Sequence, residues 1–246
     1  MDHKNVRLMA HSTFKIASIS VLVFLNLVRI ANIAGVINIA FATSTPTVRD
    51  SNLQVQTVTT GLSLPTSMAF IGPNDVLVLE KNTGMVKRIK GGKVLPEPLL
   101  DVNVATESER GMLGIDVLKL STNLYQVFLY YTKAQSSDGG TPIANQLVRY
   151  LLINHPALGP AQGRMVAPKI LLNLPVTPGP NHNGGKVVFG PDRIVYTVLG
   201  DLNRVTQAQN FENGPSPDGT SGILRVNLLG QTVGAGILGF THPLNK

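Results

Sequence analysis

The sequence contains no cysteine and no tryptophan, and only 14% of its 246 residues are charged. Without cysteine, the chain can form neither a disulfide framework nor a metal site built on thiolates. The low charged fraction, together with 43% hydrophobic residues, favours a packed globular domain over a disordered chain. No amphipathic helical pattern of useful length follows residue 42, so helices are not expected to form the core.

Glycine and proline, in contrast, are frequent, with 24 and 16 residues. The apolar residues fall in short runs between these turn formers, which is typical of many short strands joined by tight turns. The sequence therefore predicts an all-β domain.

The first 42 residues form an apolar leader. Lys4, Arg7 and Lys15 precede an uncharged apolar run over residues 16–28, and a second apolar stretch ends at the small-residue sequence Ala40-Phe41-Ala42. A basic segment, an apolar run and a small-residue cleavage pattern, in this order, are typical of a signal peptide. We therefore expect residues 1–42 to direct export, which places the domain outside the cytoplasm.

Two alternatives to a cleaved signal remain open. The leader is long for a signal peptide, and an uncleaved anchor would provide the only predicted contact with a membrane, although Arg29 is unfavourable in a spanning helix. The other alternative is an apolar leader without a role in export. Residues 43–52, rich in Thr, Ser and Pro, are expected to form a linker to the domain.

The formal net charge of +7 at pH 7 raises the question of an acidic partner such as nucleic acid. Part of this charge belongs to the leader, and the remaining basic residues are scattered. The densest group lacks interleaved aromatics and is interpreted as a solvated strand edge; it comprises Lys87, Arg88, Lys90 and Lys93. No nucleic-acid partner is predicted.

The body of the chain repeats one β unit, an inner hairpin followed by an outer strand that carries an arginine. The hairpins are predicted at 67–71 with 76–80, at 113–117 with 126–132, and within 186–199, and the outer strands at 85–89, 146–151 and 223–227. The spacing exceeds the roughly 40 to 50 residues of compact propeller repeats, so loop insertions are expected at 133–145, 154–169 and 203–220.

Repeated strand units of this kind predict a β-propeller, and a β-sandwich is the alternative. Propellers close with roughly 4 to 8 blades, whereas the chain holds about three units before Lys246. We therefore expect residues 53–246 to be the N-terminal part of a propeller whose remaining blades lie elsewhere. An open propeller of this kind leaves apolar sheet faces bare.

His182 and Asp201 lie at the two outer ends of the third hairpin, and antiparallel pairing about its turn would bring them together. An imidazole titrates near neutrality and suits a general base, and a carboxylate can fix its tautomer. No serine adjoins the pair in sequence, so a nucleophilic hydrolase is not indicated. Taken alone, a turn histidine and a strand-end aspartate without a catalytic role remain the alternative.

Glu107, Glu109 and Arg110 precede the first strand of the second hairpin, as His182 precedes that of the third. Inner strands line the channel of a propeller, so the loops before them are expected to face one mouth. A charged turn without a role in binding is the alternative.

Several motifs in this order resemble those of the glucose/sorbosone dehydrogenases. They are Gly61-Leu-Ser-Leu-Pro-Thr-Ser-Met-Ala-Phe70, Leu79-Glu-Lys-Asn-Thr-Gly84, Glu109-Arg-Gly-Met-Leu-Gly114, His182-Asn-Gly-Gly-Lys186, Phe189-Gly-Pro-Asp192 and Gly200-Asp201. These enzymes are soluble aldose dehydrogenases that depend on pyrroloquinoline quinone and have a six-bladed propeller. The resemblance extends from about Leu53 to the end of the chain.

The resemblance implies that His182 removes the proton of a sugar hydroxyl, with Asp201 as its partner, while hydride passes to the quinone. It further implies that Glu109, Arg110 and Asn181 contact the cofactor, although the family has glutamine at Glu109 and aspartate at Asn181. The family's other cofactor-binding residues and its calcium-binding backbone oxygens would follow Lys246, so this chain alone is expected to be inactive.

The implied partners are a small sugar and an external electron acceptor. A non-catalytic extracellular propeller that binds a partner or a glycan is the alternative, because a shared fold does not guarantee a working site.

Overall fold

The computed structural model describes residues 47–204 and 218–234. The chain divides into two compact units, residues 1–56 and 57–246. The leader and residues 43–46 of the expected linker lie outside the described residues, as does most of the insertion expected at 203–220. In the described part of the chain there is no helix, and therefore none long and apolar enough to cross a membrane. The all-β prediction is confirmed.

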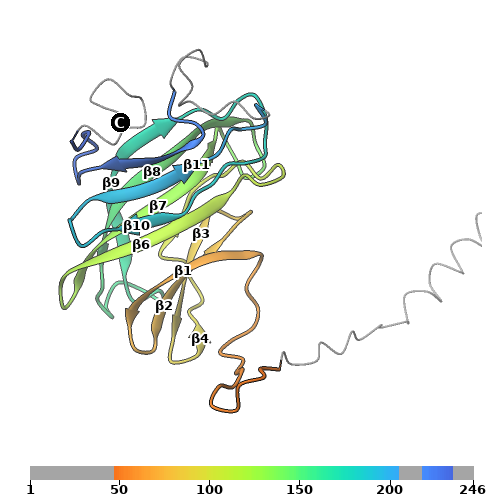
Figure 1. Ribbon diagram of the computed structural model, residues 1–246. Helices are drawn as coiled ribbons and strands as arrows, with labels where there is room; N and C mark the ends of the chain where they lie inside the picture. The colour runs from red at the N-terminus through yellow and green to blue at the C-terminus, as the bar shows by residue number, and fades with distance from the viewer. Residues whose placement is uncertain (1–46, 205–217, 235–246) are drawn as a thin grey trace, which may run out of the picture. The chain divides into compact units, whose positions relative to one another are not determined.

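The strands form three antiparallel sheets in which, except for β5, each strand pairs with its neighbour in the sequence (Figure 1). Blade 1 contains β1 (Pro65–Gly72), β2 (Asp75–Glu80), β3 (Met85–Lys90) and β4 (Lys93–Val94), with β5 (Leu100–Asp101) also paired to β3. Blade 2 contains β6 (Met112–Ser121), β7 (Leu124–Ala134), β8 (Pro142–Ile153) and β9 (Arg164–Leu174). Blade 3 contains β10 (Val187–Phe189), β11 (Val195–Leu199) and β12 (Gly222–Val226).

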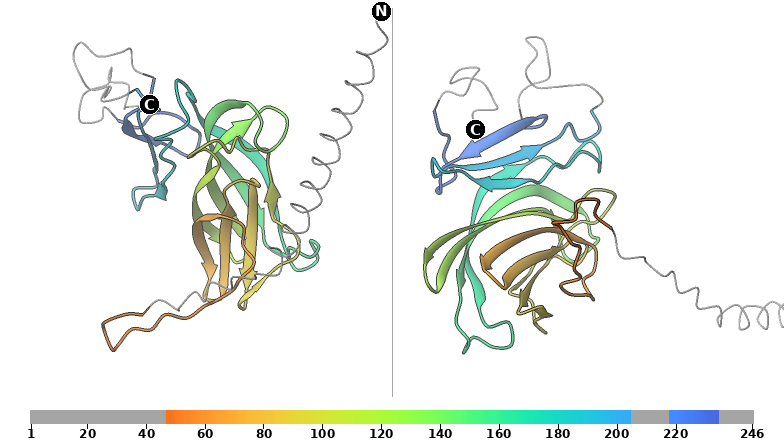
Figure 2. Two further views of the ribbon diagram at one scale, coloured as in Figure 1. Left: turned by 90° about the vertical axis from the view of Figure 1, so that its right-hand side faces the viewer. Right: turned by 60° about the horizontal axis from the view of Figure 1, so that its bottom comes forward.

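The first strands of the three sheets are neighbours, since β6 contacts both β1 and β10. Figure 2 shows blade 2 between blade 1 and blade 3. Sheets that each pack face to face on the next, with their first strands side by side, are successive blades of a β-propeller. The three predicted hairpins and the three predicted outer strands are confirmed as β1 to β3, β6 to β8 and β10 to β12.

Two of the expected insertions are shorter than predicted. The region 133–145 supplies the ends of β7 and β8, which leaves residues 135–141 as the connection, and the region 154–169 contains the start of β9. Pro168 made β9 hard to recognise, because proline cannot donate to a ladder and is confined to edge strands and irregularities. Here β9 is the last strand of its sheet, and its register shifts around Pro168 where Ala167 has a φ of 51°.

Blade 2 is buried on both faces, which explains the nearly continuous apolar run of β7. Val127, Leu129 and Tyr131 join the core that blade 2 shares with blade 1. Phe128 and Tyr130 alternate with them and join the core shared with blade 3. Phe128 stacks on Phe189 of β10 with ring centroids 5.5 Å apart. The core is therefore two layers, one on each side of blade 2.

The two end blades each carry exposed apolar residues on the face that points away from blade 2. In β1, Ala69 and Ile71 are buried in the shared core, whereas Met68 and Phe70 are 61% and 60% exposed. In blade 3, Ile223 of β12 is 64% exposed. These are the faces that neighbouring blades cover in a closed propeller.

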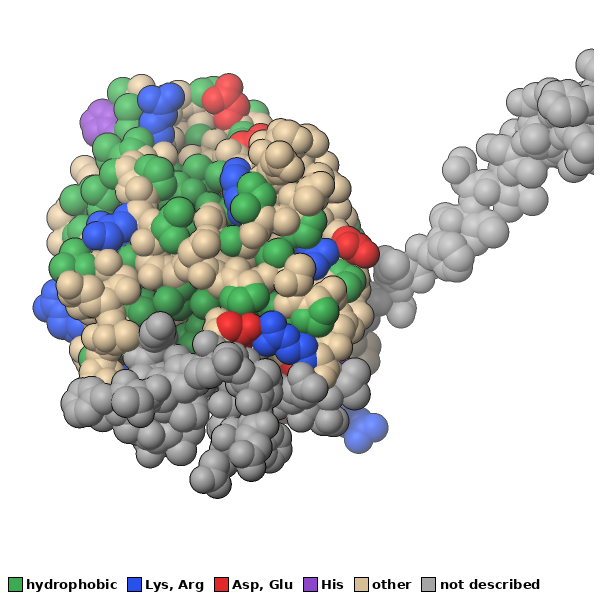
Figure 3. Space-filling model, turned by 90° about the horizontal axis from the view of Figure 1, so that it is seen from above, with side chains coloured by type: hydrophobic (Ala, Val, Ile, Leu, Met, Phe, Trp, Pro, Cys, Tyr) green, Lys and Arg blue, Asp and Glu red, His purple; other side chains and the backbone are tan. Residues whose placement is uncertain are grey.

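The basic group of blade 1 differs from the prediction, because Arg88 is fully buried. Its guanidinium forms a two-pronged ion pair with Asp75, with N–O distances of 2.8 and 2.5 Å. It also donates to Asn154 Oδ1 and Gln162 O, in the connection between β8 and β9. On the face of the domain shown in Figure 3, Lys and Arg side chains stand apart from one another. Arg88 thus joins blade 1 to blade 2 and is not part of a solvated edge.

Candidate functional site

The loop of residues 178–185 leads from blade 2 into β10 and carries His182. The backbone of His182 is left-handed, with a φ of 60°, which is uncommon for residues other than glycine. A Cβ at position 200 would collide with the backbone oxygen of His182, so only glycine permits this approach. The end of β11 and the loop before β10 therefore lie against each other.

His182 and Asp201 form the central pair of the site. His182 Nδ1 lies 2.5 Å from Asp201 Oδ1, so the prediction that the hairpin brings the two together is confirmed. Since a carboxylate only accepts hydrogen bonds, Nδ1 carries the proton and Nε2 of the neutral ring keeps its lone pair. The hydrogen bond and the charge of Asp201 raise the pKa of His182 above its ordinary value of 6.5, and the charge of Glu109 adds to this.

Replacing Asp201 by asparagine is expected to lower the pKa of His182 towards 6.5, because both contributions of the carboxylate are lost. The folded pKa lies above the unfolded value, so the pair stabilises the fold fully below pH 6.5 and ceases to do so as the pH rises through the folded pKa. Solvent screens this effect, since the His182 side chain is 56% exposed. NMR titration of the His182 ring protons measures the shift.

Asp192→Asn is the matched control for this titration. Asp192 lies in the turn at the opposite end of the same hairpin and accepts a hydrogen bond from the Tyr196 hydroxyl at 2.6 Å. It should leave the His182 titration unchanged. An unaltered titration in Asp201→Asn would contradict the ion pair.

The loop that precedes β6 contributes a second set of contacts. The backbone N–H of His182 donates to Glu109 Oε2 at 2.5 Å, and the Ser108 hydroxyl donates to Asn181 Oδ1. From the other side, Asn203 Oδ1 accepts the backbone N–H of Asn181 at 2.8 Å. Glu109, Asn181 and His182 thus lie together at one end of the sheets, and contact of the first two with a cofactor stays a prediction.

Arg110 has a different environment from its neighbour Glu109. Its side chain is buried and donates to Val176 O at 2.5 Å and to Glu107 Oε2 at 2.9 Å. The bond to Val176 joins the loop before β6 to the segment that follows β9, and the bond to Glu107 lies within the loop. The contacts favour a structural role for Arg110, and its contact with a cofactor also stays a prediction.

Beneath the His182 loop lie buried polar residues that the sequence did not single out. Asn145 of β8 and Asn183 are both fully buried, and Asn145 Nδ2 donates to Asn183 Oδ1 at 3.2 Å. The Tyr130 hydroxyl donates to Asn183 O at 3.0 Å. Asn145 fell within an expected insertion, where an asparagine is an ordinary turn residue. Only the position of Asn183, directly after His182 in a glycine-rich bend, could have drawn attention to it.

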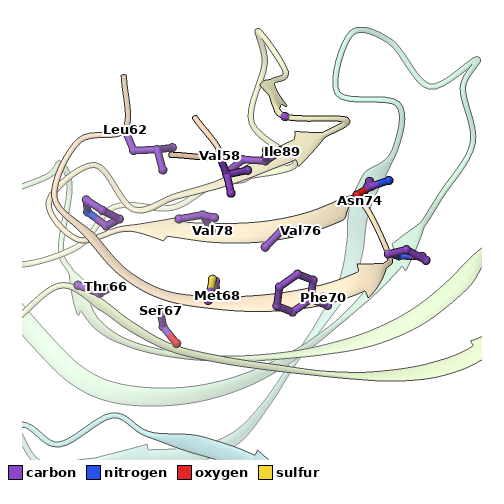
Figure 4. Close-up of a pocket in the computed structure, with 13 residues that line it drawn as sticks. Val58, Leu62, Thr66, Ser67, Met68, Phe70, Asn74, Val76, Val78 and Ile89 are labelled. Carbon is purple, nitrogen blue, oxygen red and sulfur yellow. The ribbon is translucent and has the colours of Figure 1, made fainter. Parts of the chain in front are cut away.

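A separate cavity of about 540 Å³ lies against blade 1 (Figure 4). Its walls are mainly apolar, with Met68 and Phe70 from β1, Val76 and Val78 from β2, and Val58 from the segment that covers them. None of its lining residues belongs to the His182 site. The cavity is part of the apolar end face of blade 1.

The fold and the site together define a class of protein, an all-β propeller with a candidate proton-accepting site. The described residues form three of its blades, and two of these blades bring together a glutamate and a histidine that is paired with an aspartate. The family model of Glucose / Sorbosone dehydrogenase matches residues 62–232, and the chain belongs to this family. The resemblance found in the sequence motifs is confirmed, as is the propeller fold.

Solved structures similar to the chain include two dehydrogenases. A glucose dehydrogenase of Thermus thermophilus is 25% identical, with a TM-score of 0.58 over 76% of this chain and 52% of that one. The PQQ-bound form of aldose sugar dehydrogenase from Streptomyces coelicolor is also 25% identical, with a TM-score of 0.59 over 75% and 51%.

Similar curated proteins are the Hedgehog-interacting proteins of Mus musculus and Homo sapiens. The mouse protein is 27% identical over 185 residues, which are 72% of this chain and 26% of the relative. The human protein is 26% identical over 183 residues, with nearly the same shares of 71% and 26%. The chain thus spans about a quarter of these relatives and about half of the two dehydrogenases.

Proposed function

We propose that the chain is part of an exported quinoprotein oxidoreductase that oxidises an aldose at its anomeric hydroxyl, with His182 as the base. The observation that carries this proposal is the 2.5 Å contact between His182 Nδ1 and Asp201 Oδ1, at the end of the blades where Glu109 also lies. Membership of the glucose/sorbosone dehydrogenase family and the similarity to a PQQ-bound aldose sugar dehydrogenase support it. The signal-peptide pattern of residues 1–42 supports the export part of the proposal.

The contacts of His182 suit proton removal from a hydroxyl. Asp201 holds the proton on Nδ1, so Nε2 accepts the hydroxyl proton and the ring becomes an imidazolium. Asp201 and Glu109 stabilise that positive charge, as the raised pKa of His182 indicates. Pyrroloquinoline quinone, when bound, supplies the acceptor for the hydride and its two electrons, which leave the anomeric carbon as the aldose becomes a lactone.

The described residues fit one side of such a site. They provide a base with an exposed ring, and polar groups on Glu109 and Asn181 beside it. The quinone carries carboxylates, and two cations of the described residues bind protein groups: Lys81 the carbonyl of Ser108, and Arg204 the carboxylate of Asp218. We therefore assign the base and one edge of the site to the described residues of this chain.

The test is a dye-reduction assay on the intact protein that contains this chain, loaded with pyrroloquinoline quinone and calcium. We expect an artificial electron acceptor to be reduced with aldoses as substrates, and no reduction when the quinone is omitted. Absence of reduction with every aldose and alcohol tried would refute the proposal.

A second candidate is a non-catalytic extracellular propeller that binds a partner or a glycan. The observation that favours it is the similarity to the Hedgehog-interacting proteins, which are named for an interaction and not for a reaction. Equilibrium dialysis of the intact protein against pyrroloquinoline quinone measures whether the quinone binds, and this distinguishes the two functions. Retention of the quinone supports the enzyme, and binding of a partner or glycan without quinone retention supports the second candidate.

A further inference from the structure

We propose that Asn145 of β8 is a positioning residue for His182, and that it acts from blade 2 through Asn183. The hydrogen-bond partners of the Asn145 side chain are Thr132, Pro175 and Asn183, the residue next to His182. Its catalytic consequence rests on the proposed function, whereas its effect on the His182 ring does not.

Asn145 is held in one orientation by three hydrogen bonds. Its Oδ1 accepts from the Thr132 hydroxyl of β7 at 2.6 Å, and its Nδ2 donates to Pro175 O at 2.8 Å and to Asn183 Oδ1 at 3.2 Å. Thr132 and Asn145 are both fully buried. A buried amide that loses a partner is left without water to replace it, so this arrangement is strongly preferred over alternatives.

Asn183 links Asn145 to the loop that contains His182. Its side chain is fully buried and donates through Nδ2 to Pro180 O, which closes the loop around His182. Its backbone oxygen accepts from the Tyr130 hydroxyl of β7. Burial raises the pKa of Tyr130, so its hydroxyl stays protonated and remains a donor. Both the side chain and the backbone of Asn183 are therefore fixed by blade 2.

The backbone of residues 181–183 sets the direction of the His182 ring. Asn181 binds Ser108 and Asn203, His182 binds Glu109 through its N–H, and Asn183 binds Asn145 and Tyr130. The ring itself is 56% exposed, so a screened ion pair is its main direct restraint. A left-handed backbone at His182 must be maintained by the surrounding contacts, and the hydrogen bonds of Asn183 are among them.

The test compares Asn145→Leu with Gln146→Leu in the 246-residue chain. Gln146 is the next residue of β8, and its amide donates to Asn173 Oδ1 of β9 at 2.8 Å, outside the loop. The readout is the NMR titration of the His182 ring, which the carboxylates of Asp201 and Glu109 face. We expect the titration to move to lower pH in Asn145→Leu, because the ring leaves Asp201, and to stay unchanged in Gln146→Leu.

Two milder variants keep the test decisive if Asn145→Leu does not fold. Thr132→Val removes one bond to Asn145, and Tyr130→Phe removes the bond to Asn183 O. Each is expected to move the His182 titration in the same direction by a smaller amount. If the folded variants titrate as the parent chain does, Asn145 is only a structural residue and the proposal is wrong.

The same variants distinguish this proposal from the proposed function. In the intact, quinone-loaded protein, Asn145→Leu is expected to lower turnover by up to about 100-fold with little change in KM, since misplaced reacting groups affect the chemical step. A shifted titration in a protein that reduces no dye would support the positioning role and refute the enzyme. An active parent enzyme with an unshifted titration would do the opposite.

Discussion

Replacing His182 by asparagine is expected to lower turnover of the intact, quinone-loaded protein by about 10²- to 10⁴-fold, the usual contribution of a general base. The loss arises because the asparagine side chain offers no basic nitrogen in place of Nε2. Asparagine is preferred over alanine because it tolerates the left-handed backbone of position 182, which has a φ of 60°. The fold should be retained, since the side chain is 56% exposed. Dye reduction and thermal unfolding are measured on the same samples.

His155→Asn is the matched control for this substitution. His155 lies in the turn after β8, where its Nδ1 accepts the backbone N–H of Ala157 at 3.2 Å. Turnover should be unaffected by this change. Full turnover in His182→Asn, with the quinone bound, would rule out His182 as the base.

Replacing Arg88 by methionine is expected to lower the free energy of unfolding by about 3–5 kcal/mol, the usual loss when one partner of a buried ion pair is removed. The carboxylate of Asp75, 15% exposed, would lose its two-pronged partner. Asn154 Oδ1 and Gln162 O would lose a donor as well. For a domain of this size the melting temperature should fall by about 6–20 °C, as measured by circular dichroism.

Two further variants isolate the cause of this loss. Lys87→Met changes the adjacent, partly exposed residue of β3 and should have little effect. The double variant Arg88→Met/Asp75→Ala should recover part of the lost stability, because no unpaired carboxylate remains. If the loss of unfolding free energy in the double variant equals the sum of the losses in Arg88→Met and Asp75→Ala, the ion pair is not the cause.

The hairpins were predictable from the sequence because the two strands of each hairpin are close together in the sequence. A turn such as Gly72-Pro73-Asn74-Asp75 lies between two apolar runs, and the register that follows pairs Gly72 with Asp75. The same reasoning placed His182 beside Asp201, 19 residues apart along one hairpin. Local pairing thus accounts for the blades and for half of the site.

Contacts between blades were not predictable in this way. Arg88 looked like a member of a basic strand edge, yet its partners include Gln162, 74 residues further on. Asn145 lay in a polar stretch, and its partner Asn183 lies 38 residues further on, in the loop that leads to the next blade. Nothing in the local pattern of either residue distinguishes a buried partner from solvent, because the deciding contact arises only when one sheet packs on another.

Residues 181–183 are bonded on one side to blade 2 and on the other to the end of β11 and the turn after it. In an array whose sheets touch only their neighbours, partial opening at a junction costs less than dissolving a sheet. A small separation of blades 2 and 3 on warming would release His182 from Glu109 and Asn183 from Asn145 while every strand kept its ladder. Heat inactivation would then be an early, local and reversible event that leaves the secondary structure unchanged.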